Sequence, residues 1–188
     1  MAISKIKTAS ILDATIATAD IADGAVTAVK TTGVGGNNKP FFQASRSSDQ
    51  SLSDSTLTAI VCQQEYLDTG SLYDTSTGKF TMDSTNAGKY FCLFRASIDA
   101  DTNFSSTGNY FGVEIRKYNS SNALQQTHRT RMGFSNIYWP TAVTAGVFDL
   151  ANGDYLIPYA TVTASGRVII GTSGSLQYVE FSGYKLIS

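Results

Sequence analysis

The side chains that most often carry catalysis are few and widely spaced in this sequence. His128 is the only histidine, so neither a histidine-based triad nor a multi-histidine metal site can form within one chain, although a threefold axis could gather three copies. Cys62 and Cys92 lack the C-x-x-C spacing of zinc sites, and we interpret them as two buried free thiols. We therefore interpret His128 as a solvated or hydrogen-bonded strand residue.

The glutamates do not form a catalytic carboxylate pair. Hydrolysis of a glycan needs two carboxylates that face each other across a groove. Glu65, Glu114 and Glu180 are far apart along the chain and form no local pair. We therefore predict that the protein is not an enzyme and that it holds no cofactor, and a glycan depolymerase stays as the alternative from that class.

Asp99, Asp101 and Asn103 alternate after an apolar run, and oxygens spaced in this way can bind Ca²⁺. The sequence nevertheless lacks the glycine and the distal glutamate of a known calcium loop. Runs of Asp and Asn are also ordinary loop chemistry. We predict no metal site here, with calcium as the open alternative.

A candidate binding surface is formed by Arg129, Arg131, Tyr138 and Trp139. The two arginines share one face of a polar strand and could meet an anionic glycan or a capsid surface. They could equally be solvated and paired across strands with residues such as Glu114, which is the interpretation we favour. Exposed aromatic rings can stack on sugars or anchor an interface, whereas a loop that folds back would bury them.

Composition points to β-structure and excludes two classes of partner. The 188 residues are 42% hydrophobic and only 15% charged, with ten Tyr and ten Phe. A net charge of −1 offers no basic field for nucleic acid. No window approaches the roughly 20 apolar residues of a membrane span, and the first residues lack the apolar core of a secretory signal. We expect no membrane insertion.

Residues 1–30 repeat with a period of five. A β-branched residue recurs at the first position of each pentad: Ile6, Ile11, Ile16, Ile21 and Val26. On a helix, side chains five positions apart do not share one face. On a strand, side chains five positions apart point to opposite faces. We predict an extended stalk or attachment segment whose chains wind together, so that each repeat buries its Ile against other copies. A tail that stays disordered is the alternative.

Residues 31–39 are rich in Gly and Asn and predict a linker. Residues 40–188 show short apolar alternations separated by turn residues, which predicts an all-β sandwich of about eight to ten strands. Asn152-Gly153 predicts a two-residue hairpin turn with both residues at positive φ. Besides an opening strand at Phe41, the expected strands are 56–66, 88–99, 109–119, 124–135, 141–150, 154–163, 167–171 and 176–187.

Three motifs in residues 40–188 resemble the C1q-like domain of the C1q and tumour-necrosis-factor superfamily. They are the run Leu72-Tyr73-Asp74 to Gly78-Lys79-Phe80, the run 88–94, and the ending 178–186. The resemblance implies a ten-strand jelly roll that assembles as a homotrimer and binds rather than catalyses. It also places Cys62 and Cys92 where the family carries phenylalanines. The motif residues are Tyr73, Phe80, Gly88, Tyr90, Phe94, Phe181, Gly183 and Tyr184.

The pentads resemble a second group, the Ile/Asp/Ala/Thr repeats of phage tail-fibre and related virion proteins. Together the two likenesses predict a structural virion protein of a tailed phage: a homotrimeric fibre or capsid-decoration protein. Its knob would bind a host-surface glycan or the capsid, and its N-terminal segment would bind other virion proteins. The alternatives are a receptor-binding fibre tip with depolymerase activity and a bacterial C1q-like adhesin, which should carry an export signal.

Overall fold

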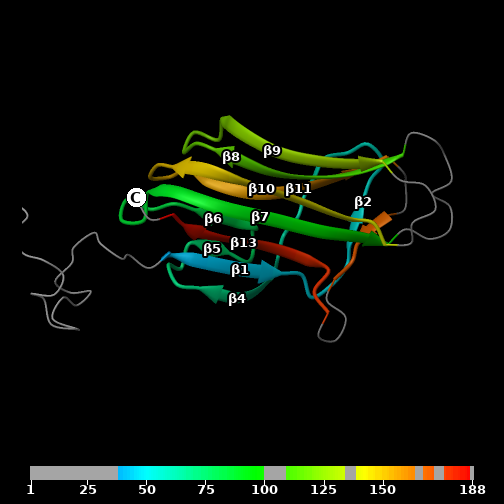
Figure 1. Ribbon diagram of the computed structural model, residues 1–188, viewed down its shortest axis with the longest axis horizontal. Coiled ribbons are helices and arrows are strands. Elements are labelled where there is room, and N and C mark those ends of the chain that lie inside the picture. Colours follow the sequence, from blue (N-terminus) through cyan, green and yellow to red (C-terminus); the bar gives the residue numbers. More distant parts are fainter. Residues whose placement is uncertain (1–37, 100–108, 134–138, 164–166, 172–175, 187–188) are drawn as a thin grey trace, which may run out of the picture. The chain divides into compact units, whose positions relative to one another are not determined.

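The computed structural model describes residues 38–99, 109–133, 139–163, 167–171 and 176–186 (Figure 1). All of them belong to one compact unit, Asn38–Ser188. The pentad residues Ile6, Ile11, Ile16, Ile21 and Val26 lie outside the described residues, as do most of the linker, Tyr138, Asp101 and Asn103. No helix in the described part of the chain is long and apolar enough to cross a membrane.

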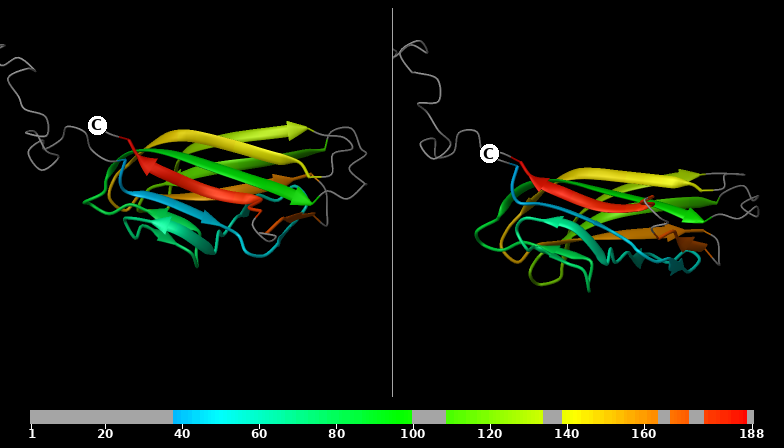
Figure 2. Two further views of the ribbon diagram at one scale, coloured as in Figure 1. Left: turned by 60° about the horizontal axis from the view of Figure 1, so that its bottom comes forward. Right: turned by 90° about the horizontal axis from the view of Figure 1, so that it is seen from below.

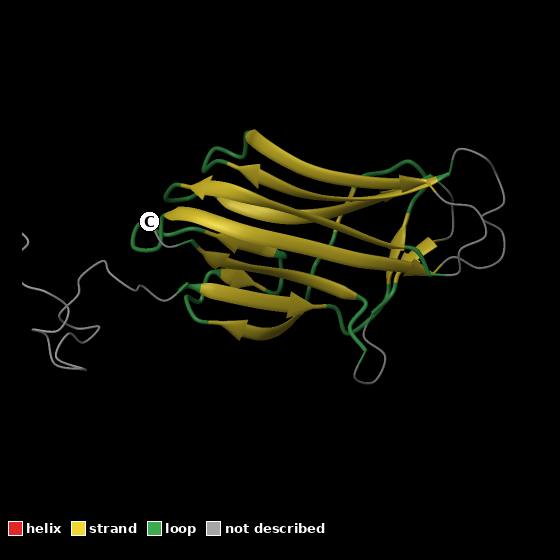
Figure 3. Cartoon of the chain, in the orientation of Figure 1, coloured by secondary structure: helices red, strands yellow, loops and turns green. Residues whose placement is uncertain are grey.

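The described residues form two stacked sheets of seven and six strands (Figures 2 and 3). In the first sheet β10, β7, β13, β1 and β4 lie side by side, and β12 and β2 extend it at the end of β7. In the second the order is β5-β6-β11-β8-β9, with β3 beside β11. The strands are β1 Phe41–Ser45, β2 Gln50–Leu52, β3 Thr58–Ala59, β4 Gln64–Asp68, β5 Tyr73–Asp74, β6 Lys79–Thr81, β7 Gly88–Asp99, β8 Tyr110–Tyr118, β9 Leu124–Gly133, β10 Thr141–Leu150, β11 Tyr155–Val162, β12 Arg167–Ile169 and β13 Val179–Lys185.

Alternation explains why the long strands were predictable. In β7 the five residues Tyr90, Cys92, Phe94, Ala96 and Ile98 are all fully buried. A strand sends successive side chains to opposite faces, so one apolar set fills the space between the sheets. The predicted strands 88–99 and 141–150 are confirmed with these bounds.

Two local expectations are wrong. Residues 56–66 do not form one strand, because Thr58–Ala59 pair with β11 of the second sheet whereas Gln64–Asp68 pair with β1 of the first. Ile60 and Cys62 are buried where the chain crosses between the sheets. The turn at Asn152-Gly153 also differs, since of these two residues only Gly153 has a positive φ, 82°.

An aromatic cluster joins the two sheets. The Phe42 ring stacks on Phe80 with centroids 4.1 Å apart and on Tyr73 at 5.4 Å, and it meets Phe181 edge-on at 4.9 Å. Phe80 in turn meets Tyr90 edge-on at 5.4 Å. Such ring pairs add stabilisation beyond the burial of their area. Because β1, β5, β6, β7 and β13 each contribute a ring, the cluster fixes how the sheets are stacked.

Gly183 makes room for this cluster. A Cβ at this position would lie 2.6 Å from the Cys92 sulfur, 2.9 Å from the Phe42 ring and 3.1 Å from the Phe91 carbonyl oxygen. These separations are shorter than van der Waals contact, so a side chain would push β13 away from β7 and β1. Close approach of the strands therefore accounts for the glycine in the motif that ends the chain, residues 178–186.

We expect Gly183→Ala to lower the free energy of unfolding by about 1–3 kcal/mol, since overpacking a closed core has a cost of that size. Chemical denaturation of the wild type, Gly183→Ala, Cys92→Ala and the double variant measures the effect. Removing the sulfur creates space for the new methyl group, so the double variant should lose less than the sum of the single losses. Additive losses would contradict the proposed clash.

The free edges of β9 and β10 lie next to each other at one side of the sandwich. The His128 ring of β9 covers Gly146 of β10, where a Cβ would come within 2.5 Å of the ring, and it meets the Phe148 ring edge-on at 4.9 Å. Gln126 donates to the Val147 carbonyl oxygen at 3.1 Å. Side chains thus bridge two strands that share no ladder of backbone hydrogen bonds. His128 packs here, and its Nε2 lies 2.8 Å from the Gln126 Nε2, which agrees with its interpretation as a hydrogen-bonded strand residue.

Candidate functional site

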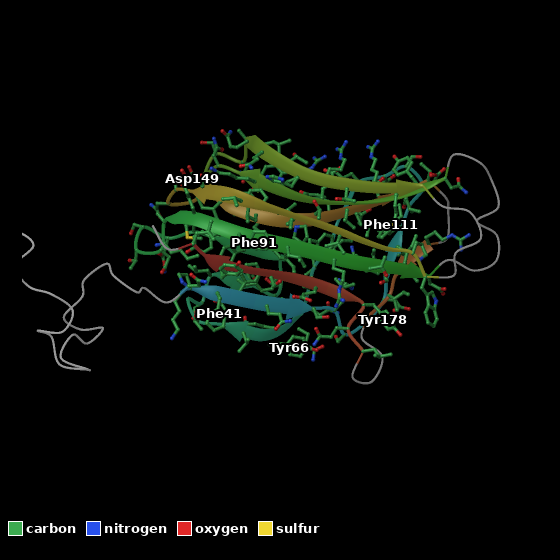
Figure 4. All side chains as sticks on the ribbon, in the orientation of Figure 1. Phe41, Tyr66, Phe91, Phe111, Asp149 and Tyr178 are labelled. Carbon is green, nitrogen blue, oxygen red and sulfur yellow. The ribbon has the colours of Figure 1, made fainter. Side chains whose placement is uncertain are left out.

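An exposed apolar row crosses the outer face of the first sheet. Val147, Phe91, Tyr184 and Phe41 lie directly opposite one another on β10, β7, β13 and β1. Val147 is 47% exposed and Tyr184 38% exposed, and the Phe91 and Tyr184 rings lie 5.6 Å apart. Figure 4 labels Phe41 and Phe91 on this face. Contiguous exposed apolar surface marks interaction sites in soluble proteins.

The next row on this face is mixed, and the third holds a charged pair beside Val143, which is 44% exposed. Leu93 lies between Ala145 and Ser182, and Leu67 on β4 is 48% exposed. Farther along, Arg95 and Glu180 pair at 3.6 Å. A hollow of about 530 Å³ opens among the side chains of β1, β4, β7 and β13 here, lined by Phe41, Leu67, Phe91 and Leu93 among others. The charged pair therefore lies away from the apolar row, as the polar rim of a protein interface lies away from its core.

The outer face of the second sheet carries a buried carboxylate between two arginines. Glu114 of β8 is 1% exposed, and its Oε2 accepts from the Arg116 Nε at 2.7 Å. Its Oε1 pairs with Arg129 of the neighbouring strand β9. The cross-strand pair expected from the sequence is thus present, and Glu114 is much more deeply buried than a strand face exposed to solvent would suggest. The charges of Arg116 and Arg129 are therefore already paired with that of Glu114.

Tyrosine rings cover the rest of this face. The Arg116 guanidinium lies 5.2 Å from the Tyr159 ring centroid, and the Arg131 guanidinium lies 4.7 Å from that of Tyr110. Tyr118 donates from its hydroxyl to that of Tyr159 at 3.1 Å. Burial, followed by this hydrogen bond, raises the pKa of Tyr159. The arginines are thus held by ring contacts and ion pairs.

The candidate residues Arg129, Arg131 and Trp139 lie in different surroundings. The two arginines are on the outer face of β9, whereas Trp139 precedes β10 and lies against Tyr178, with ring centroids 6.1 Å apart. Trp139 is 58% exposed, so it does not fold back into the core. The contact between Tyr178 and Trp139 was not predicted, because the two residues are 39 positions apart in the sequence.

The motif residues divide between core and surface. Tyr73, Phe80, Tyr90, Phe94 and Phe181 are buried, together with Cys62 and Cys92. Burial raises the pKa of the Cys62 thiol to about 12 and also raises that of Cys92, so neither is a ready nucleophile. Gly88 has a φ of 146° at the start of β7. Tyr184 is the one motif side chain on the apolar row. The described residues hold no group of three or more potential metal-ligating side chains from His, Cys, Asp and Glu.

The Asp74 carboxylate organises the turn between β5 and β6. It accepts from the Ser76 amide at 2.8 Å, the Ser76 hydroxyl at 2.6 Å and the Thr77 hydroxyl at 2.8 Å. The Gly78 amide donates to the Asp74 carbonyl oxygen at 2.8 Å, and Gly78 has a φ of 72°. The Tyr-Asp…Gly-Lys-Phe motif is therefore a turn that closes on the aromatic cluster. The hydrogen bonds lower the Asp74 pKa from 3.8 to about 2.

We expect NMR titration to give Asp74 a pKa near 2. A depressed pKa contributes stability above the ordinary value of 3.8, and this contribution is lost as the pH falls towards about 2. Asp74→Asn should therefore remove the part of the pH dependence of unfolding that falls in this window. A carboxyl titrating close to 3.8, or an unchanged pH profile in Asp74→Asn, would show that these hydrogen bonds do not form in solution.

Comparison with known proteins identifies the fold. The globular domain of zebrafish complement 1qA protein is similar over 79% of this chain and 98% of its own length, with a TM-score of 0.54 at 16% identity. Murine APRIL is similar over 78% of this chain and 98% of its own, with a TM-score of 0.54 at 14% identity. No protein-family model and no curated protein matches the sequence. The predicted all-β sandwich of the C1q and tumour-necrosis-factor type is confirmed as a fold.

Proposed function

We propose that this protein is a homotrimeric virion protein of a tailed phage, a fibre or capsid-decoration protein whose C1q-like knob binds a host-surface or capsid target. The main support for a trimer is the apolar row on the outer face of the first sheet, which consists of Val147, Phe91, Tyr184 and Phe41. Four adjacent strands present apolar side chains there at the same level. A second and a third copy of the chain would cover them.

Charge and chemistry favour binding over catalysis. The apolar row contains no pair of titratable groups that could transfer a proton. The Arg95–Glu180 pair, which lies in the third row of the same face, is partly exposed. On the second sheet the buried carboxylate of Glu114 is paired with Arg116 and Arg129. We therefore expect a module that acts through contact, and three knobs on one stalk would add avidity for a repeated target.

The pentad repeat supports the virion role. Residues 1–30 resemble repeats of phage fibre proteins, and their recurring Ile or Val gains a partner only when chains assemble. In this proposal the segment winds with its copies or attaches to other virion proteins, while the sandwich faces outward. The protein would then be assembled in the host cytoplasm and function on the virion.

Solution mass by light scattering tests the trimer. The full-length chain should have three times the mass of 20.1 kDa, about 60 kDa. A chain that starts at Lys39 should also be trimeric if the sandwich supplies the interface. A trimer only for the full-length chain would assign assembly to the pentads, and a stable full-length monomer at micromolar concentration would contradict the proposal.

Binding to host cells and to empty capsids separates the two locations. Strong capsid binding without cell binding would identify a decoration protein, and the reverse would identify a receptor-binding tip. Incubation with host polysaccharide provides the test of the enzymatic alternative. Release of reducing ends would show a depolymerase and overturn the binding role.

A further inference from the structure

A second hollow, of about 260 Å³, opens where β7 ends and where β10 and β13 begin. Its lining is Asp49, Asp99, Trp139, Ile170 and Tyr178. This volume is below the roughly 300–1,000 Å³ of pockets that enclose drug-sized ligands, so it suits a single ring. Figure 4 shows Tyr178 at this end of the sandwich, beside the start of β13. The hollow is separate from the apolar row.

Two aromatic rings form one side of the hollow, and β7 holds the backbone at Tyr178 and next to Trp139. The Ser97 amide donates to the Tyr178 carbonyl oxygen at 3.0 Å, and the next amide, that of Ile98, donates to the Pro140 carbonyl oxygen at 3.2 Å. The rings of Trp139 and Tyr178 meet at an interplanar angle of 66°. Most tryptophans are largely buried, yet this one is 58% exposed. It therefore offers exposed ring surface to a ligand, next to the Tyr178 ring.

Two carboxylates supply hydrogen-bond acceptors. Asp49 Oδ1 accepts from the Gly171 amide at 2.7 Å, which orients its side chain. A Cβ on Gly171 would lie 2.5–2.7 Å from backbone atoms of Ser48, so this approach requires glycine. Asp99 is exposed at the end of β7. Neither carboxylate takes part in an ion pair within the described part of the chain.

These groups select a neutral, hydroxyl-rich ring. The C–H face of a pyranose can lie on Trp139 while carboxylate oxygens accept from its hydroxyls. Two carboxylates repel an anion. A cation is disfavoured because the buried Arg46 guanidinium donates to the Asp49 carbonyl oxygen at 3.4 Å, which places a positive charge close to one of the two carboxylates.

We propose that this hollow binds a neutral hexopyranose unit of a glycan, with Trp139 stacked on the ring and Asp99 and Asp49 accepting its hydroxyl groups. The proposal deepens the binding role proposed above and rests on it. The five lining residues come from one chain, so a trimer would present three sites to a repeated glycan, and the avidity of the particle would exceed the affinity of one site.

Titration of the full-length protein with methyl glucopyranoside, methyl galactopyranoside and methyl mannopyranoside, followed by saturation-transfer NMR, tests the site. We expect at least one of these ligands, each with about 13 non-hydrogen atoms, to bind with a Kd on the order of 1 mM. Trp139→Ala should weaken binding about tenfold or more, whereas Trp139→Phe retains most of it. Leu124→Ala is the matched control. Leu124 is also an exposed apolar side chain, at 48%, and it lies at the start of β9, away from the hollow.

Asp99→Asn separates a sugar from a cation. An amide oxygen still accepts from a hydroxyl, so hexoside binding should change by less than about threefold. The proposal is overturned if none of the three hexosides binds, if Trp139→Ala binds as well as the wild type, or if tetramethylammonium binds instead and is lost in Asp99→Asn. One subunit suffices for binding, so the two proposals can fail separately. A monomer that binds a hexoside would contradict the trimer but not the sugar site. A trimer that binds no hexoside would contradict the sugar site but not the trimer.

Discussion

In a chain that starts at Lys39 and so lacks the pentads, replacing Val147 with glutamate is expected to convert the trimer to a monomer of one third of its mass. Val147 is 47% exposed in the single chain, so a carboxylate there remains hydrated and the fold of the monomer is retained. In the trimer the same group would be buried among Phe91, Tyr184 and their copies. An unpaired charge removed from water costs several kcal/mol, and three copies incur this cost together.

Light scattering at micromolar concentration measures this result. Leu176→Glu is the matched control, since Leu176 is 59% exposed but precedes β13 instead of lying on the apolar row. It should remain trimeric. If Val147→Glu leaves the mass of this chain unchanged, the apolar row is not the subunit interface and another surface must be considered.

Phe42→Ala is expected to lower the free energy of unfolding by about 3–5 kcal/mol. The side chain is 2% exposed and contacts the rings of Tyr73, Phe80 and Phe181, which come from both sheets. Its removal loses the transfer free energy of a phenyl group and leaves a cavity that rigid strands cannot close. The loss is large compared with the 5–15 kcal/mol of a typical domain.

Denaturation with urea in the monomeric Val147→Glu background of the chain that starts at Lys39 measures this loss without a contribution from subunit dissociation. Phe42→Leu, which refills most of the space, should lose about 1.5 kcal/mol or less. Equal losses for the leucine and alanine variants would mean that the ring stacking matters more than the filled volume. A loss below about 1 kcal/mol for Phe42→Ala would show that the cluster does not join the sheets.

The long strands were predictable because each has one apolar face, as the buried even-numbered residues from Tyr90 to Ile98 show. The apolar row could also have been found. Phe91 and Leu93 lie on the alternate face of the same strand, where Lys89 and Arg95 are polar, and an apolar patch on an outer face indicates an interaction surface. The short strands β2, β5 and β6 escaped prediction, because two or three residues are too few to show a period.

The hollow at the end of the sandwich could not be predicted in the same way. Asp49, Asp99, Trp139 and Tyr178 are distant in the sequence and meet only because the strands that precede or follow them converge at one end. The depth of Glu114 was hidden for a similar reason. Its burial comes from neighbours on β9 and β11, chiefly Arg129 and the strand partner Tyr159, which sequence alternation within β8 does not reveal.

The opposite directions of β1 and β13 determine how the domain would carry a mechanical load. The backbone enters β1 beside Tyr184, at the end of β13, while Tyr178 and the proposed sugar hollow lie at the start of β13. A pull between residue 38 and a bound ligand therefore acts on these two neighbours in shear. Such a force loads every residue pair between β1 and β13, from Phe41–Tyr184 to Ala44–Phe181, at the same time. The backbone hydrogen bonds between these strands must therefore break together instead of one after another. Resistance to such a force is governed by the rate of unfolding, and this strand arrangement suits a module that holds on to a moving surface.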